Sequence, residues 1–198
     1  MNIITTQNSK LGGMIAQVNM PYLTTCRDDA PCKNGCYCAK GNLNYPSVKK
    51  SHMDKYNLYK KNPEAFFNMI DAELNMIPYK FFRWHSSGDI PDVQYLDLMF
   101  KLARKHKETR FLCFTKKDYL VNGYLELKKR KPSNLVIVLS HWDMWHPYNP
   151  FNLPESYVDF GHGNIPEMVY QCGGSCADCP GTHCWFMHYG DKVVFEKH

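Results

Sequence analysis

The chain has 198 residues, of which 44% are hydrophobic and 22% are charged. These proportions are ordinary for a globular protein and exclude a wholly disordered chain. The longest apolar run, residues 135–139, is far shorter than the roughly 20 residues needed to span a bilayer. Residues 1–10 contain no basic patch followed by an apolar stretch, so we expect no secretory signal and a soluble, cytoplasmic protein.

The net charge of +5 is distributed unevenly along the chain. Residues 101–131 carry eleven basic and three acidic side chains, whereas residues 132–198 carry two basic and seven acidic ones. A basic stretch attracts phosphate backbones, but it is also typical of a solvated helix face, which is the interpretation we favour. We therefore expect nucleic acid to bind only weakly and without specificity.

The predicted elements alternate between strands and helices. Residues 13–19 are expected to form a strand, and a long cysteine-bearing loop should follow over residues 21–49. Apolar side chains at spacings of three and four predict a helix over residues 63–76, with Asn62 as its N-cap and Pro63 in its first turn. The remaining predicted elements are a strand over 80–85, a helix over 91–106, a strand over 110–115, a helix over 118–130 and a strand over 134–140.

This alternation is the pattern of right-handed βαβ units, so the predicted fold class is α/β with parallel strands. A full (βα)8 barrel typically needs about 250 residues, so this chain predicts a partial or compressed (βα) barrel. We expect a single domain over residues 1–198, with a βα-repeat core over 1–140. Residues 141–198 are predicted to be a loop-rich, cysteine-containing extension that ends in a short hairpin around Gly190 and Asp191.

Nine cysteines are present without an export signal. Disulfides are rare in a reducing cytosol, so these thiols are expected to be metal ligands. Cys113 lies alone in a predicted strand and is expected to be a small core residue. The other eight form two compact groups. The N-terminal group comprises Cys26, Cys32, Cys36 and Cys38, and the C-terminal group comprises Cys172, Cys176, Cys179 and Cys184.

The C-terminal group has the spacing C-x3-C-x2-C-x4-C, with glycines between the thiols. Four such thiols can enclose one iron–sulfur cluster, and Pro180 directly follows a cysteine as in ferredoxins. Zinc is the competing metal, although four-cysteine zinc ribbons usually pair two C-x2-C knuckles that lie far apart in the sequence. We favour an iron–sulfur cluster over zinc, and structural disulfides are the third alternative.

The N-terminal group offers three well-separated thiols. Cys36 and Cys38 are too close in sequence to ligate one metal easily, so Cys38 is its weakest candidate. A [4Fe–4S] cluster held by three cysteines keeps one iron open to an outside ligand, as catalysis at that iron requires. The alternatives are a site closed by all four cysteines and one cluster shared with the C-terminal group. The sequence thus predicts one cluster or two.

Polar residues follow two of the predicted strands. Arg83 and His85 share a face of an alternating strand, at the end where βα proteins place their sites, and together could bind an anion or a cofactor carboxylate. The alternatives are that His85 is a core histidine and that Asp89 caps the helix beginning near Pro91.

After the next strand, His141, Asp143 and His146 could bind a divalent metal. Because Trp142 and Trp145 flank them, the segment could instead line an aromatic pocket or shield a cluster from water and oxygen. We favour the shielding role.

Several segments, in the same order, resemble the phage-type gene product 88 family. They are Thr25-Cys26, Cys32-Lys-Asn-Gly-Cys36-Tyr37, Arg83-Trp-His85-Ser-Ser-Gly88-Asp89 and Phe114-Thr115-Lys116, together with the C-terminal cysteine group and residues 193–198. The resemblance covers nearly the whole chain. That family occurs mostly in bacteriophages and bacterial mobile elements. It is similar to cut-down radical S-adenosylmethionine (SAM) enzymes, with a cysteine loop after the first strand.

The resemblance implies a [4Fe–4S] cluster in the N-terminal loop and makes SAM a candidate cofactor. Cys32 and Cys36 match the first interval of the radical SAM C-x3-C-x2-C motif. The third cysteine would fall on Ala39, so Cys26 would supply the missing thiol. Residues 87–91 occupy the place of the Gly-Gly-Glu-Pro stretch that holds the methionine amino group. The candidate cofactor-binding residues are therefore Arg83, His85, Gly88 and Asp89.

Three functions compete. The first is an iron–sulfur protein with radical-SAM-like redox chemistry at an open cluster iron. The second is a non-catalytic iron–sulfur protein for electron transfer or redox sensing, and the third is a zinc-stabilised nucleic-acid-binding module. The expected partners are a small molecule or a redox protein, without a membrane. The sequence names no substrate.

Overall fold

The computed structural model describes residues 2–6, 8, 10–13, 15–127, 129–162, 165–179 and 182–197. Within these residues seven strands form one sheet in which every pair of neighbours is parallel. The order across the sheet is β1-β2-β3-β4-β5-β7-β6. The strands are β1 (Ile15–Val18), β2 (Phe81–Trp84), β3 (Arg110–Thr115), β4 (Leu135–Ser140), β5 (Glu155–Asp159), β6 (Tyr170–Gln171) and β7 (Lys192–Glu196).

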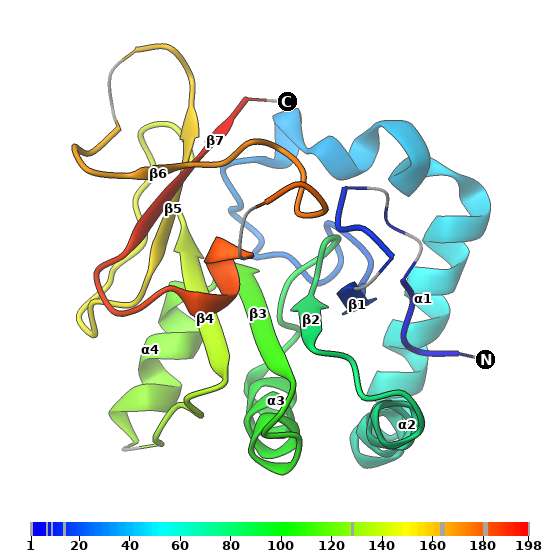
Figure 1. Cartoon of the computed structure of the whole chain (residues 1–198). Helices are drawn as coiled ribbons and strands as arrows, with labels where there is room; N and C mark the ends of the chain where they lie inside the picture. The colour runs from blue at the N-terminus through cyan, green and yellow to red at the C-terminus, as the bar shows by residue number, and fades with distance from the viewer. Residues whose placement is uncertain are drawn as a thin grey trace.

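The helices lie together on one face of this sheet (Figure 1). The first five strands are neighbours in chain order, as in a barrel that has been left open. The predicted α/β class, with parallel strands in a partial (βα) barrel, is therefore confirmed. The helices are α1 (Pro46–Lys61), α2 (Pro63–Met76), α3 (Val93–Lys105) and α4 (Asp118–Glu126).

Side-chain caps fix the starts of two helices. The side chain of Asn62 accepts a hydrogen bond from the backbone of Ala65 at 3.0 Å, which confirms the predicted start of α2. At α3 the cap is Asp92, whose carboxylate accepts from the Tyr95 backbone at 2.9 Å. The interpretation of Asp89 as the cap of this helix is wrong, because α3 starts after Asp92.

Two predicted boundaries differ from the structure. Helix α1 begins at Pro46, inside the expected loop of residues 21–49. Its buried face includes His52 and Lys55, so the sequence lacks the apolar periodicity that would have revealed it. Helix α4 ends at Glu126, before the predicted boundary, and Leu127 is its C-cap.

The outer face of the sheet packs against the helices in one continuous core. Trp84 and Phe111 are fully buried there, and Tyr95 of α3 contacts Trp84 edge-on. Burying each such ring contributes about 2 kcal/mol or more. The predicted core residue Cys113 lies in this layer with no exposed surface, so that prediction is confirmed.

The inner face of the sheet is covered by the segment that follows β6. Trp185 lies in a short 3-10 helix, η4 (His183–Phe186), and packs against Leu112 and Val138. Its indole N–H donates to the Phe82 carbonyl at 3.1 Å. Three cysteines, Cys172, Cys176 and Cys184, pack against the same cluster. The C-terminal segment therefore fills the space inside the open barrel.

The hairpin predicted around Gly190 and Asp191 is wrong. The chain does turn there, with Gly190 at a φ of 83°, but its backbone N–H donates to the Asn152 carbonyl at 2.8 Å. The turn is thus anchored next to the start of β5. Strand β7 then runs parallel to both of its neighbours instead of pairing back on the preceding segment.

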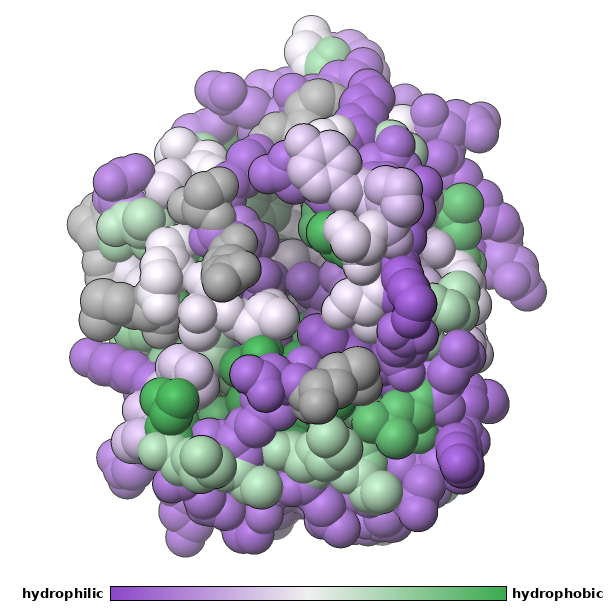
Figure 2. Space-filling view, turned by 90° about the vertical axis from the view of Figure 1, so that its right-hand side faces the viewer, coloured by the Kyte–Doolittle hydropathy of each residue, from purple (hydrophilic) through white to green (hydrophobic). Residues whose placement is uncertain are grey.

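The face that carries β1 and α1 is shown in Figure 2, where a row of apolar side chains crosses the lower part and a hollow lies above it. The last turn of α2 contributes to the exposed apolar surface, since Met76 and Ile77 are 81% and 53% exposed. Among the described residues, no helix is long and apolar enough to cross a membrane.

Candidate functional site

The N-terminal cysteine loop lies against the carboxyl end of β2. Its three short 3-10 helices are η1 (Lys33–Gly35), η2 (Tyr37–Ala39) and η3 (Gly41–Asn44). Gly88 allows this close approach. It has a φ of +77°, and a Cβ there would lie 2.6 Å from Thr25 Oγ1 and 2.7 Å from the Met20 carbonyl oxygen. The contact fixes the position of the first cysteine, Cys26.

Asp89 ties the loop to two strands. Its carboxylate accepts hydrogen bonds from the Thr115 hydroxyl at 2.6 Å and from the Lys116 backbone at 3.0 Å. Its own backbone N–H donates to Thr25 Oγ1 at 3.0 Å. Asp89 is buried, and burial raises the pKa of its carboxyl. These contacts give Asp89 a structural role.

Three thiols of the N-terminal group lie within electrostatic reach of one another. Burial raises the pKa of Cys26 to about 11, and the charges of Asp89, Cys32 and Cys36 add to the rise. A hydrogen bond from the Cys38 thiol lowers the pKa of Cys36 to about 6. Cys36 is therefore the thiol of this group that ionises most readily.

Cys38 is the most deeply buried thiol of the N-terminal group. It is only 2% exposed, and its Sγ lies 3.9 Å from the Ser86 carbonyl oxygen. Hydrogen bonding to Cys36 and burial both raise the pKa of Cys38. The ranking of Cys38 as the weakest ligand candidate of the group stays a prediction.

Aromatic side chains lie over the N-terminal loop. A Cβ at Gly35 would lie 3.4 Å from the ring of Trp142, and the Lys116 ammonium lies 5.6 Å from the same ring. Phe160 meets Trp142 edge-on, with centroids 5.2 Å apart. Trp142 thus lies against the N-terminal loop, next to Gly35, and its shielding role stays a prediction.

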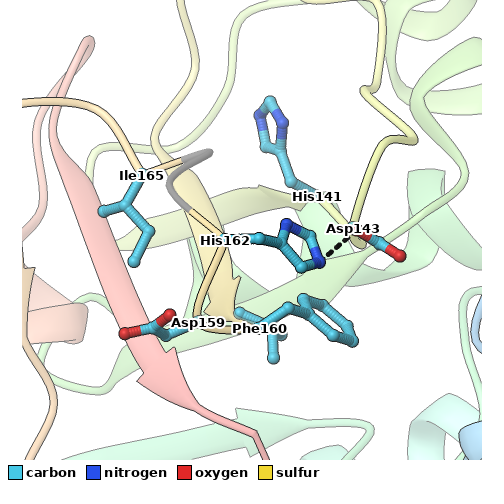
Figure 3. A pocket seen from close by; sticks show the side chains of 7 residues that line it. His141, Asp143, Asp159, Phe160, His162 and Ile165 are labelled. Atoms are coloured by element: carbon cyan, nitrogen blue, oxygen red, sulfur yellow. Dashed lines mark ion pairs between the residues drawn. The ribbon is translucent and has the colours of Figure 1, made fainter.

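Two of the three polar residues of this segment, His141 and Asp143, line the same small pocket, which His146 does not line. The Nδ1 atoms of His141 and His146 are 2.9 Å apart. Asp143 instead pairs with His162 at 3.2 Å, beside the ring of Phe160, in this pocket (Figure 3). His141 stacks on Tyr157. The divalent-metal interpretation therefore finds no shared ligand geometry here.

The C-terminal group is anchored to both ends of the chain. The Cys172 backbone donates to Val194 of β7 at 2.9 Å, and the Cys176 backbone donates to Lys10 at 2.7 Å. The hydroxyl of Tyr170 lies 3.5 Å from the sulfur of Cys179.

The four thiols of this group also act on one another. Burial raises the pKa of Cys184 to about 12, and the neighbouring charges of Cys172, Cys176 and Cys179 raise it further. The same two causes raise the pKa of Cys176. The structure thus brings four partly buried thiols near one another, and their role as metal ligands stays a prediction.

Arg83 is the cation on the inner face of β2 beside these thiols. Burial raises the pKa of Cys176, Cys184 and Tyr37, and the charge of Arg83 partly offsets that rise. The guanidinium lies over the ring of Phe114, 4.3 Å from the ring centre. Its buried Nε has no hydrogen-bond partner among the described residues. Arg83 therefore acts electrostatically on two thiols of the C-terminal group and on Tyr37 of the N-terminal loop.

His85 does not share this face, contrary to the alternation expected along the strand. Its φ of +55° breaks the strand geometry. The ring packs instead on the helix side, where Nε2 lies 3.1 Å from the Tyr95 hydroxyl and Nδ1 lies 3.9 Å from Cys113 Sγ. Burial lowers the pKa of His85 to about 3, so the imidazole is neutral. The structure thus places Arg83 beside the thiols and His85 away from them.

All nine cysteines fall within the described residues, and all are free thiols. In this part of the chain no three His, Cys, Asp or Glu side chains are already arranged as a metal site. Pro180 and His198, which belong to the patterns noted in the sequence, lie outside the described residues. The structure contains two groups of thiols, and backbone contacts hold each group in place.

The sequence profile of the Gene product 88 family matches residues 2–185. The chain belongs to this family. The match includes both cysteine groups and every strand of the Gene product 88 fold except β7. No curated protein and no solved structure matches the chain.

Sequence reasoning about this Gene product 88 protein missed two residues near the thiols. Lys116 follows β3 directly, and its charge lowers the pKa of Cys32 and Cys36. Tyr170 precedes the C-terminal group and contacts Cys179. Lys116 could have been found from the sequence, because it lies at the carboxyl end of a predicted parallel strand, where such folds place their sites. Tyr170 carried no signal beyond its nearness to Cys172.

Proposed function

We propose that this Gene product 88 protein is an iron–sulfur protein in which each cysteine group binds one cluster. The observation that carries the proposal is the pairing of free thiols with Arg83. Arg83 is partly buried, its buried Nε has no hydrogen-bond partner, and among the described residues no carboxylate forms an ion pair with it. An unpaired charge is costly to the extent that it is removed from water. A cluster bound by cysteine thiolates is anionic and would supply the missing counter-charge.

Two clusters are favoured over one shared cluster by the pattern of electrostatic effects. The thiols whose charges raise the pKa of Cys26 are Cys32 and Cys36, which belong to its own group. The pKa of Cys184 is likewise raised by the charges of the three other thiols of the C-terminal group.

The residues of this chain fit an iron–sulfur cluster in other respects. Iron–sulfur clusters take cysteine thiolates as ligands, and nearby positive charge and limited solvent exposure tune their reduction potential. When bound, such a cluster supplies one-electron transfer. Arg83 would offset its negative charge, and Trp142 would limit the access of water and oxygen to the N-terminal group.

The predicted SAM-binding residues do not fit SAM as well. The carboxylate of Asp89 is taken up by Thr115 and the backbone, and both ring nitrogens of His85 face protein atoms. Electron transfer or redox sensing is therefore the function we favour, and radical-SAM-like chemistry at an open iron is the rival.

The test is anaerobic iron and sulfide analysis of freshly purified protein. We expect about eight of each per chain, from two four-iron clusters. Cys32→Ser and Cys179→Ser should each remove about half of the iron, whereas Cys113→Ser, the matched control in the core, should keep all of it. Zinc without sulfide would overturn the proposal. Added SAM that changes the electron paramagnetic resonance spectrum of the reduced protein would favour the rival.

A further inference from the structure

A groove lies where β4, β5 and β7 begin, and it plays no part in the cysteine sites. It is formed by the chain after α4, by the approach to β5 and by the turn before β7. The residues that line it are Leu125, Lys129, Arg130, Lys131, Phe151 and Tyr189. It is open to solvent, with a volume of about 970 Å³ that includes part of the opening.

Among the described residues, the positive charges of this groove have no ion-pair partner, although the charge of Lys129 reaches Asp97. No carboxylate forms an ion pair with Lys129, Arg130 or Lys131 among the described residues, although other lysines of the basic segment do have such partners. Arg104 of α3 donates to the backbone carbonyl of Arg130 at 2.6 Å, which brings a fourth cation to the rim. The groove therefore carries charge to which a polyanion can bind.

The groove also offers aromatic surface. Tyr189 is 59% exposed, and the Lys131 ammonium lies 5.6 Å from its ring. Phe151 packs on the core and leaves part of its ring in the groove. Proteins that bind single strands combine these two features, since cations contact the phosphates while bases stack on exposed rings.

We infer that this groove binds single-stranded nucleic acid. The cations alone would suit any polyanion, but the exposed rings favour unpaired bases, which can stack on them. Duplex DNA keeps its bases stacked internally and would use only the charges. Two acidic residues, Glu126 and Asp191, lie near these segments in the sequence, but among the described residues neither forms an ion pair with the cations of the groove. The carboxylate of Asp191 accepts a hydrogen bond from the His188 backbone at 2.6 Å.

The inference is tested by fluorescence anisotropy with a labelled oligothymidylate of about 15 nucleotides, over a series of salt concentrations. The double variant Lys129→Gln/Arg130→Gln should weaken binding about tenfold. It should also reduce the salt slope, which is the slope of log K against log salt concentration, by about two, because the protein loses one phosphate contact for each cation that is removed. Tyr189→Leu should weaken binding about fivefold while the salt slope stays unchanged, because it removes stacking and no charge.

The matched control is Lys60→Gln/Lys61→Gln, which removes the same charge from the exposed last turn of α1. It should bind as the unmodified protein does. The inference is overturned if this control weakens binding as much as the groove variants. It is also overturned if a duplex or polyglutamate binds as tightly as the single strand, or if Tyr189→Leu has no effect. Circular dichroism of each variant confirms that the fold is intact. Because iron content is measured separately, failure here leaves the cluster proposal standing.

Discussion

At Gly88 the backbone conformation and the nearest neighbours both exclude a side chain. Its φ is +77°, and a Cβ would lie 2.6 Å from Thr25 Oγ1. We expect Gly88→Ala to lower the free energy of unfolding by about 2 kcal/mol or more, through strain and the displaced cysteine loop. Urea unfolding measures this change.

Gly123 provides the comparison, because a Cβ there meets nothing within 4 Å. Gly123→Ala lies inside α4 and should stabilise the protein by about 0.4–1 kcal/mol. If the two substitutions had the same effect on unfolding, Gly88 would not hold the loop in the way described.

The inward position of Cys38 gives a prediction for the N-terminal group. Cys38→Ala should leave the iron content nearly unchanged, because this thiol faces the Ser86 carbonyl. Cys32→Ala should remove the cluster of that group. Iron analysis of both variants, purified anaerobically, checks this. Equal loss of iron from both would show a site closed by four cysteines.

Single residues show where sequence reasoning succeeds. Ligand spacing is a local property, so the two cysteine groups could be predicted. The separate placements of Arg83 and His85 could not be, because they depend on one positive φ at His85. The unsatisfied Nε of Arg83 could not be predicted either, since it depends on how the C-terminal segment packs inside the sheet.

Helix α1 carries an unusual buried pair. His52 and Lys55 are 5% and 2% exposed, and the pKa values of both are lowered mainly by burial. The Lys55 ammonium lowers the pKa of His52 further, to about 4. Glu73 of α2 raises the pKa of Lys55 and so partly offsets the effect of burial. The packing of α1 therefore requires a neutral imidazole.

This pair predicts a pH dependence of stability. Because the pKa of His52 is about 4 in the folded protein and 6.5 ordinarily, the unfolded chain binds the proton more tightly. The contribution of neutral His52 is complete above pH 6.5 and is lost as the pH falls toward 4. We expect a loss of about 2 kcal/mol after allowance for solvent screening. Urea unfolding between pH 4 and 7 measures it, and His52→Gln should remove this part of the slope.

At the scale of elements, the sequence predicts best where apolar periodicity is strong. Helix α2 and strand β3 match their predicted bounds, since both bury regular apolar patterns. Helix α1 was missed because its buried face is partly polar. Strands β5 and β7 were missed because prolines and aromatic residues break the pattern around them, and because β7 pairs with strands far away in the sequence.

The whole molecule depends on the C-terminal segment, which packs three cysteines against the inner core. If that group binds a cluster, removing the iron should destabilise the fold as well as bleach the protein. We expect the chelated protein to melt at a lower temperature and to bind more of a hydrophobic dye. Cys179→Ser, compared with Cys113→Ser, gives the same test without a chelator. Unchanged melting after complete removal of iron would contradict this prediction.

The position of β7 between β5 and β6 has a consequence for how the protein is made. Residues 192–196 are synthesised after every other strand, yet they occupy an internal place in the sheet. Until they and Trp185 leave the ribosome, β6 has no partner to pair with, and the inner surfaces of β3 and β4 stay exposed to the cell. The nascent chain is therefore open to chaperones until translation of this segment is complete.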